Sequence, residues 1–207
     1  MKIFEKYKKK WLEKSIYNKI GDGIFVVLIV LLIIPSSRFK LMGFVSGIRA
    51  EIVQPTEIKS NDTLKLTEND YLWQLKSITG EDVNLLKFKE KVLFINFWAT
   101  WCPPCVGEMP GIQNLFNEFK NNEAVQFIIL TNEDPEKVKT FLKKYNYTLP
   151  FFTSIYKTPD VFETNTIPAT YVISSDGKIV VKEFGAANWD GEKSINLIKK
   201  LIKDSYK

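Results

Sequence analysis

The sequence "KVLFINFW", residues 91–98, runs without a break into "ATWCPPC". A continuous apolar run of this length is typical of a strand that is buried on both faces of a sheet. Pro103 and Pro104 then favour the start of a helix, because proline is tolerated in a first helical turn. The chain is therefore expected to place its only two cysteines, Cys102 and Cys105, where a central strand turns into a helix.

The rest of the C-terminal two thirds alternates between strand and helix patterns. Apolar alternation and turn signals predict two hairpins, a second buried strand and two further helices. The hairpins cover residues 71–88 and 168–185, the strand covers residues 124–131, and the helices cover residues 134–146 and 188–204. Asp134 and Pro135 are a typical N-cap and first helical residue. This order predicts a mixed α/β fold with one sheet that is covered on both faces.

Structural roles explain the cysteine pair poorly. A disulfide stabilises mainly by restricting the unfolded chain, and this effect is small when the closed loop is short. The loop between Cys102 and Cys105 holds only two prolines. A structural zinc site needs four ligands, and a chain without histidine could complete one only together with a second chain, which remains an alternative.

The position of the pair favours redox chemistry instead. Cys102 is expected at a helix N-terminus, where the unpaired N–H groups and the helix dipole stabilise an anion. This lowers the pKa of the thiol and makes a thiolate available near neutral pH. Cys105 lies one turn further along and is less exposed. One cysteine can therefore attack a disulfide and the other can resolve the mixed disulfide that results.

The N-terminal part combines a basic segment with an apolar run. Residues 1–19 contain seven lysines and two glutamates, and residues 24–34 are eleven apolar residues in succession. With its flanking residues the run approaches the roughly 17 residues that span a membrane, and the preceding lysines fit the positive-inside rule. We predict a basic cytoplasmic segment over residues 1–19 and an uncleaved transmembrane signal anchor over residues 20–36. A cleaved signal peptide and a buried core element are the alternatives.

The positive charge of the chain belongs to this N-terminal segment. The net charge of the whole chain is +5 at pH 7, and residues 1–19 account for all of it. The remaining chain is balanced, which argues against nucleic acid as a partner. Residues 37–69 are predicted to form a tether, partly apolar at first and polar in the second half.

At the cysteines the sequence resembles a known superfamily. "FWATWCPPC" looks like the active site of the thioredoxin superfamily. Together with the anchor, "GEMP" at 107–110 and "TIPATYVI" at 166–173, it resembles the TlpA-like family of membrane-anchored thiol-disulfide oxidoreductases. The resemblance covers roughly residues 70–205. It implies a thioredoxin fold for residues 70–207, a central mixed sheet flanked by helices with an N-terminal β-hairpin, preceded by one transmembrane helix.

The resemblance also implies roles for individual residues. Cys102 matches the exposed nucleophile and Cys105 the resolving cysteine. Pro168 matches a proline that these folds hold in the cis form beside the disulfide, with an ordinary trans proline at a strand start as the alternative. Ile167 would present its backbone to an extended substrate, as in strand addition. From their positions beside the motif, rather than from the resemblance, Trp101 is expected to form a partly exposed wall of the substrate surface, because aromatic residues favour interfaces, and Trp98 is expected in the core.

A carboxyl group is expected to handle protons at the cysteines. Glu108 lies one helical turn beyond Cys105, and some members of the TlpA-like family have an acidic residue there for this purpose. Thioredoxins proper carry a buried Asp six residues before the first cysteine, where this chain has Asn96. We predict that Glu108 is the general acid and base for Cys105, with a solvated helix carboxylate as the alternative.

The resemblance implies an enzyme that reduces protein disulfides in the extracytoplasmic space. It would act as a monomer and need no metal and no cofactor besides its own Cys102–Cys105 disulfide. A membrane thiol protein would supply electrons, and the substrate would be apocytochrome c or a range of proteins in need of repair.

Other functions of the same pair remain open. A thiol oxidase or isomerase of the same fold would use the same residues. A Cu(I) metallochaperone could use the two thiolates, because soft ligands select Cu(I). A peroxiredoxin-like peroxidase is less favoured, because Ala99 occupies the position at which such a site needs a threonine.

Overall fold

The computed structural model describes residues 15–58, 64–154 and 157–206. Residues 1–14, which make up most of the predicted basic segment, lie outside the described residues. The chain divides into two units, Met1–Met42 and Gly43–Lys207. Each unit is described by itself below.

The first unit contains one long apolar helix. Helix α2 (Ile16–Ile33) has 18 residues, a mean hydropathy of 2.0 and no buried residue. By length and composition it can cross a membrane. It begins four residues before the predicted span of residues 20–36. Helix α3 (Pro35–Ile52) follows it and occupies the first half of the predicted tether; its residues from Gly43 onward belong to the second unit.

The second unit is built on a mixed sheet of seven strands in the order β2-β1-β5-β4-β3-β6-β7. The three central strands β5, β4 and β3 are parallel, and the remaining pairings are antiparallel. The strands are β1 (Gln74–Ser77), β2 (Asp82–Asn84), β3 (Val92–Phe97), β4 (Val125–Thr131), β5 (Phe151–Ser154), β6 (Ala169–Ile173) and β7 (Ile179–Phe184). The predicted thioredoxin fold is confirmed, including the antiparallel hairpin β1–β2 at its start.

Strand β3 lies between β4 and β6 and divides the core. Side chains of a strand alternate between the two faces of a sheet, so the continuous apolar run of β3 fills both. Phe94 belongs to the core cluster that includes residues of α5 and α7. Leu93 and Ile95 belong to the second cluster, which includes residues of the β1–β2 hairpin.

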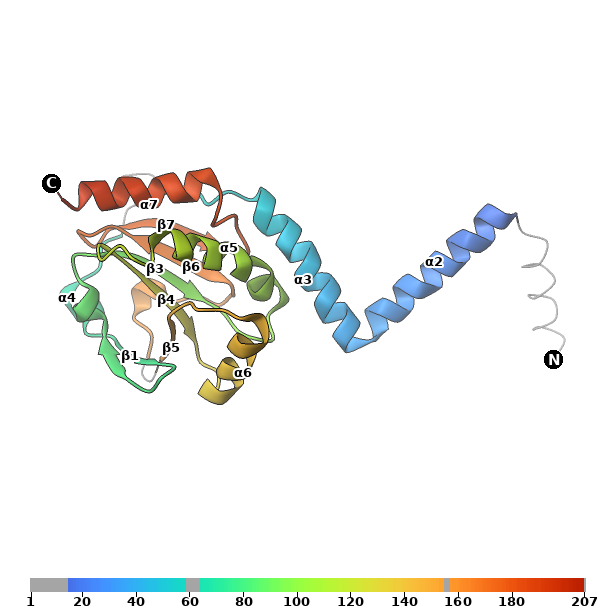
Figure 1. The fold of residues 1–207 in the computed structure, drawn as a ribbon, viewed down its shortest axis with the longest axis horizontal. Helices are drawn as coiled ribbons and strands as arrows, with labels where there is room; N and C mark the ends of the chain where they lie inside the picture. The colour runs from blue at the N-terminus through green and yellow to red at the C-terminus, as the bar shows by residue number, and fades with distance from the viewer. Residues whose placement is uncertain (1–14, 59–63, 155–156, 207) are drawn as a thin grey trace. The chain divides into compact units, whose positions relative to one another are not determined.

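Three helices of the second unit match the sequence patterns. They are α5 (Pro103–Phe119), α6 (Pro135–Tyr145) and α7 (Glu192–Asp204), and α5 and α7 lie on the same side of the sheet (Figure 1). Asp134 caps α6 as predicted, since its carboxylate accepts hydrogen bonds from the backbone of Glu136 and Lys137. Three shorter helices complete the unit: α4 (Glu68–Tyr71), η2 (Leu85–Phe88) and η3 (Asp160–Phe162).

Two features of the second unit were not predicted. Strand β5 follows Pro150 and has only four residues, which are too few to show a periodic pattern in the sequence. The second half of the predicted tether pairs with the sheet, because Glu57 forms an isolated β-bridge with Val181 of β7. Ile58 donates a backbone hydrogen bond to Val180 at 2.9 Å. The outer strand β7 has backbone groups without a sheet partner, and this segment satisfies some of them.

Phe94 is expected to be a main support of the fold. Its ring centroid lies 5.0 Å from the rings of both Phe127 and Trp189, and its side chain is fully buried. The substitution Phe94→Ala should therefore lower the free energy of unfolding by about 3–5 kcal/mol. Leu86→Ala, at a residue that is 45% exposed, should change it by no more than about 0.5 kcal/mol. Chemical denaturation in detergent checks both, and equal effects would contradict this account of the core.

Candidate active site

The two cysteines lie at the start of helix α5 and form a disulfide. Cys102 is the N-cap residue, and the backbone N–H of Cys105 donates to its Sγ at 3.3 Å. Pro103 occupies the first helical position, where the missing N–H would have no partner in the helix. The local sequence therefore holds one sulfur atom at the positive end of the helix dipole.

Both cysteines are buried from solvent. Cys105 is fully buried and Cys102 is 3% exposed, so neither is openly accessible in the disulfide form. Resemblance had suggested an exposed Cys102. The neighbouring residue Trp101 is 62% exposed. The Sγ of Cys102 lies 3.7 Å from the carbonyl oxygen of Ile167. Trp101 and Ile167 therefore border the surface nearest to the Cys102 sulfur.

The predicted substrate-binding residues lie beside this surface. The bond between Ile167 and Pro168 is cis, as expected from the resemblance. A cavity of about 280 Å³ opens between the cysteine loop, the cis-proline loop and the end of β4. Its lining is mainly apolar and consists of Phe97, Trp98, Ala99, Trp101, Leu130, Thr131, Asn132, Glu133 and Ile167. Trp98 is 2% exposed and packs on Phe141 and Phe151, which confirms its placement in the core.

Glu108 is a buried carboxyl group, only 1% exposed. Its Oε1 accepts a hydrogen bond from Nδ2 of Asn96 at 2.8 Å. Its Oε2 accepts from the backbone N–H of Ala187 at 3.2 Å and from Nε1 of Trp189 at 3.1 Å. The same amide of Asn96 also donates to Oγ1 of Thr170 at 2.8 Å. Glu108 therefore faces the protein interior, and the alternative of a solvated helix carboxylate is wrong.

Burial controls the acidity of Glu108. Loss of hydration disfavours the charged carboxylate and raises its pKa from 4.5 to about 8, against the opposing effect of the hydrogen bonds from Asn96, Trp189 and Ala187. A carboxyl group with this pKa exchanges protons near neutral pH, where thiols also titrate. Glu108 is thus able to accept or supply a proton one helical turn from Cys105.

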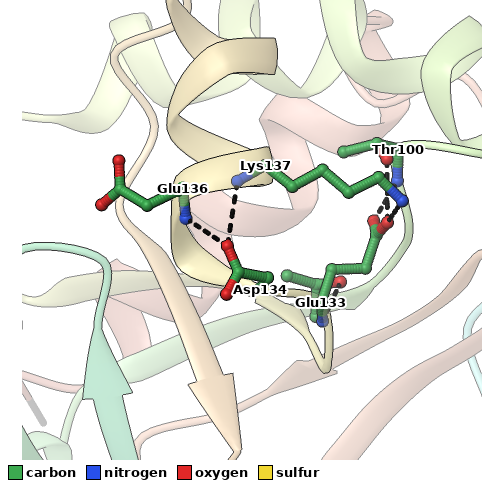
Figure 2. Close-up of polar contacts among 6 residues, drawn as sticks. Thr100, Glu133, Asp134, Glu136 and Lys137 are labelled. Atoms are coloured by element: carbon green, nitrogen blue, oxygen red, sulfur yellow. Dashed lines mark hydrogen bonds and ion pairs between the residues drawn. The ribbon is translucent and has the colours of Figure 1, made fainter.

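A second carboxylate holds the loop that leads to Cys102. Figure 2 shows the side chain of Glu133 directed toward Thr100, with the Lys137 ammonium group reaching the same carboxylate. Glu133 Oε2 accepts from the backbone N–H of Thr100 at 2.5 Å, and Oε1 accepts from the Thr100 hydroxyl at 2.9 Å. Burial alone would raise the pKa of Glu133, but the hydrogen bonds from Lys137 and Thr100 outweigh it and lower the pKa.

Sequence reasoning missed this contact. Glu133 precedes a helix cap that the sequence predicted, but nothing in the local pattern shows that its carboxylate turns back to a loop 33 residues earlier. The two segments meet because β3 and β4 are parallel neighbours, so the loops at their carboxyl ends lie together.

The described residues hold no group of three or more His, Cys, Asp or Glu side chains that could bind a metal ion. The two sulfur atoms of Cys102 and Cys105 are the chemically reactive groups of the site, and they are joined to each other. The arrangement can accept two electrons on reduction of this disulfide and donate them again on its formation.

A family model described as Redoxin matches residues 69–197. Thiol-disulfide oxidoreductase ResA of Halalkalibacterium halodurans is 30% identical over 131 residues, which are 62% of this chain and 72% of that protein. Thiol-disulfide oxidoreductase ResA of Bacillus cereus is 35% identical over 112 residues, which are 52% of this chain and 63% of that protein. The chain thus spans between three fifths and three quarters of these two relatives.

Solved structures agree on the fold. The solution structure of a candidate protein disulfide isomerase from Bacteroides thetaiotaomicron is 25% identical with a TM-score of 0.57, over 65% of this chain and 87% of that one. The crystal structure of StoA from Bacillus subtilis is 22% identical with a TM-score of 0.50, over 62% of this chain and 94% of that one, and shows likeness of fold alone.

Glu108 is expected to make the stability of the oxidised protein depend on pH. The folded state holds the proton up to about pH 8, whereas the ordinary pKa is 4.5. As the pH rises through this interval the unfolded state binds fewer protons, so the free energy of unfolding falls, by at most about 1.4 kcal/mol per pH unit. Glu108→Gln should remove this slope.

Chemical denaturation of the oxidised protein across that pH interval measures the slope. The matched control is Glu123→Gln, at an exposed glutamate, which should keep the slope of the wild-type protein. A slope that persists in Glu108→Gln would assign the pH dependence to another group.

Proposed function

The chain belongs to the Redoxin family and is related to thiol-disulfide oxidoreductases, and we propose that it reduces protein disulfides in the extracytoplasmic space. The observation that carries the proposal is the disulfide between Cys102 and Cys105 at the N-terminus of α5, beside the cis bond before Pro168. A reversible disulfide in a loop this short has little structural value. Its value lies in exchange with another disulfide.

The reaction takes place in two exchange steps. The thiolate of Cys102 attacks one sulfur of the substrate disulfide, a mixed disulfide forms, and the other substrate sulfur leaves as a thiolate that takes up a proton. Cys105 then attacks the sulfur of Cys102 and releases the second substrate sulfur. The substrate has gained two electrons, and the Cys102–Cys105 disulfide has formed again.

Glu108 supports the second step. Cys105 must lose its proton before it can attack, and it is buried away from water. A neutral thiol has no effective nucleophilicity, so a base is needed within the protein. Glu108 takes this proton in its ionised form and returns it when Cys105 is reduced again. Its pKa of about 8 allows both directions near neutral pH.

The substrate binds beside Cys102 as an extended segment. The carbonyl oxygen of Ile167 lies next to the sulfur of Cys102 and is available as a backbone hydrogen-bond acceptor for such a segment. Trp101 supplies an exposed aromatic surface, and the apolar cavity takes a neighbouring side chain of the substrate. The partner is therefore a protein that carries a disulfide in an accessible, extended stretch.

Helix α2 supports a location at the cell membrane with the catalytic domain outside the cytoplasm. It is long and apolar enough to cross a bilayer, and lysines dominate the preceding segment. An extracytoplasmic reductase needs a source of electrons. With only two cysteines the chain has no second pair to relay them, so a membrane thiol protein must reduce the Cys102–Cys105 disulfide after each turnover.

Because Cys102 is the proposed nucleophile and Cys105 the proposed resolving cysteine, only the variant without Cys105 should accumulate mixed disulfides with substrate proteins. Cys105→Ser removes the resolving thiol, so a substrate that has reacted with Cys102 should remain attached through a mixed disulfide. Cells that express the full chain are quenched with acid, and adducts are detected on non-reducing gels. Cys102→Ser is the matched control and should give no adducts. Equal adducts from the two variants would contradict the assignment of Cys102 as the nucleophile.

The direction of the reaction predicts a low reduction potential. The full chain in detergent is equilibrated against glutathione or dithiothreitol, and the fraction of reduced Cys102–Cys105 is measured. A value near the roughly −270 mV of thioredoxin, or below it, is expected for a reductase. A value toward the roughly −120 mV of a strong oxidant would instead make the protein a thiol oxidase.

A further inference from the structure

The last turns of helix α3, residues 43–52, pack on helix α5 through glycine backbones. A Cβ atom added to Gly107 would lie 2.8 Å from the carbonyl oxygen of Gly43 and 2.9 Å from the amide nitrogen of Gly47. Real Cβ atoms do not approach backbone atoms this closely, so the two helices meet at a distance that only glycine permits at position 107.

The contact is asymmetric. A Cβ atom added to Gly47 would lie 3.7 Å from the carbonyl oxygen of Gly107, which is an ordinary contact. A Cβ atom added to Gly43 would lie 3.8 Å from the carbonyl oxygen of Pro103. Alanine is thus tolerated on the α3 side and not on the α5 side. Pro103 directly follows Cys102, so α3 lies against the same turn that carries the disulfide.

The chain after α3 makes a second contact. The side chain of Asn188 donates to the carbonyl oxygen of Glu51 at 2.6 Å, and its backbone N–H donates to that of Val53 at 2.7 Å. The guanidinium of Arg49 lies where a side chain at Gly185 would be. Residues 43–53 are therefore attached both to α5 and to the loop that follows β7.

These two contacts lie next to Glu108 and next to one of its hydrogen-bond donors along the chain. Gly107 is the residue before Glu108, and Asn188 is the residue after Ala187, whose N–H donates to Glu108. We propose that residues 43–53 are a positioning segment that holds Glu108 and its hydrogen-bond donor in place, so that these eleven residues are part of the active-site structure. The inference rests on the proposed function in so far as Glu108 is the proton-exchanging group of the site.

The charged surroundings of Glu108 determine how displacement of the segment would act. Glu183 of β7 raises the pKa of Glu108 through space, Arg49 of the segment lies beside Gly185, and the sulfur atoms of α5 carry no charge in the disulfide form. Burial has the largest influence on Glu108. Water admitted beside Gly107 therefore stabilises the carboxylate and moves its titration midpoint downward.

The test uses the oxidised full chain in detergent and two readouts. Hydrogen exchange of peptides that cover residues 43–53 reports docking of the segment. The carboxyl ¹³C signal of Glu108, assigned as the one missing in Glu108→Gln, reports its titration. In Gly107→Ala, exchange should become about tenfold faster or more, and the midpoint should fall by about half a unit or more, about threefold in the protonation equilibrium.

Gly47→Ala is the matched control, with the same added methyl group on the tolerated side of the contact. In this variant, residues 43–53 should stay protected from hydrogen exchange, and its Glu108 titration midpoint is the reference value. Asn188→Ala is a second variant that leaves α5 unchanged and removes only the bond to Glu51. It should shift the midpoint in the same direction by a smaller amount.

The outcomes separate the inference from the proposed function. Protection that persists in Gly107→Ala, or a midpoint that stays fixed in both variants after protection is lost, overturns the positioning role. A midpoint that moves as expected supports it. The pH profile of thiol reactivity in Glu108→Gln is a separate measurement. An unchanged profile there would remove the catalytic role of Glu108 and leave the positioning of its carboxyl group established.

Discussion

The carboxyl group of Glu108, withdrawn from water at the centre of the site, constrains the surrounding structure. A buried polar group that loses a hydrogen-bond partner costs about 1–3 kcal/mol, so its donors must stay in register with it. Asn96 comes from β3, and Ala187 and Trp189 come from the loop between β7 and α7. The positions of α5, β3 and this loop are therefore tied together at Glu108.

The same arrangement places the two sulfur atoms in different environments. Cys102 lies at the helix N-terminus, where backbone N–H groups stabilise a thiolate, and on the side of the exposed Trp101. Cys105 is closed off from solvent and lies one turn from a carboxyl group with a pKa of about 8. In the proposed reaction, the first environment favours attack on an incoming disulfide. The second favours proton exchange within the protein, which the proposed resolution of the mixed disulfide requires.

Local patterns predicted the elements that carry the site, because their signals are long and continuous. The apolar run of β3, the prolines that open α5 and the cap at Asp134 all express the local physics of strand and helix. Strand β5 escaped prediction because four residues carry no period. The helical course of residues 35–52 escaped because its glycines and serines give no amphipathic pattern. The burial of Glu108 and the contact of Glu133 with Thr100 depend on partners 12 to 81 residues away, which no local pattern contains.

The hydrogen bond between Asn96 and Glu108 explains why this chain differs from thioredoxins proper at position 96. Thioredoxins proper carry an aspartate at the position that Asn96 occupies in this chain. An aspartate there would place a second carboxyl group within hydrogen-bond distance of Glu108, since the side chains now approach to 2.8 Å. Two buried carboxyl groups at this separation cannot both ionise. An amide avoids that conflict and donates to Glu108 in its ionised form. In this chain the buried acid therefore lies on helix α5, and Asn96 on strand β3 is its hydrogen-bond donor.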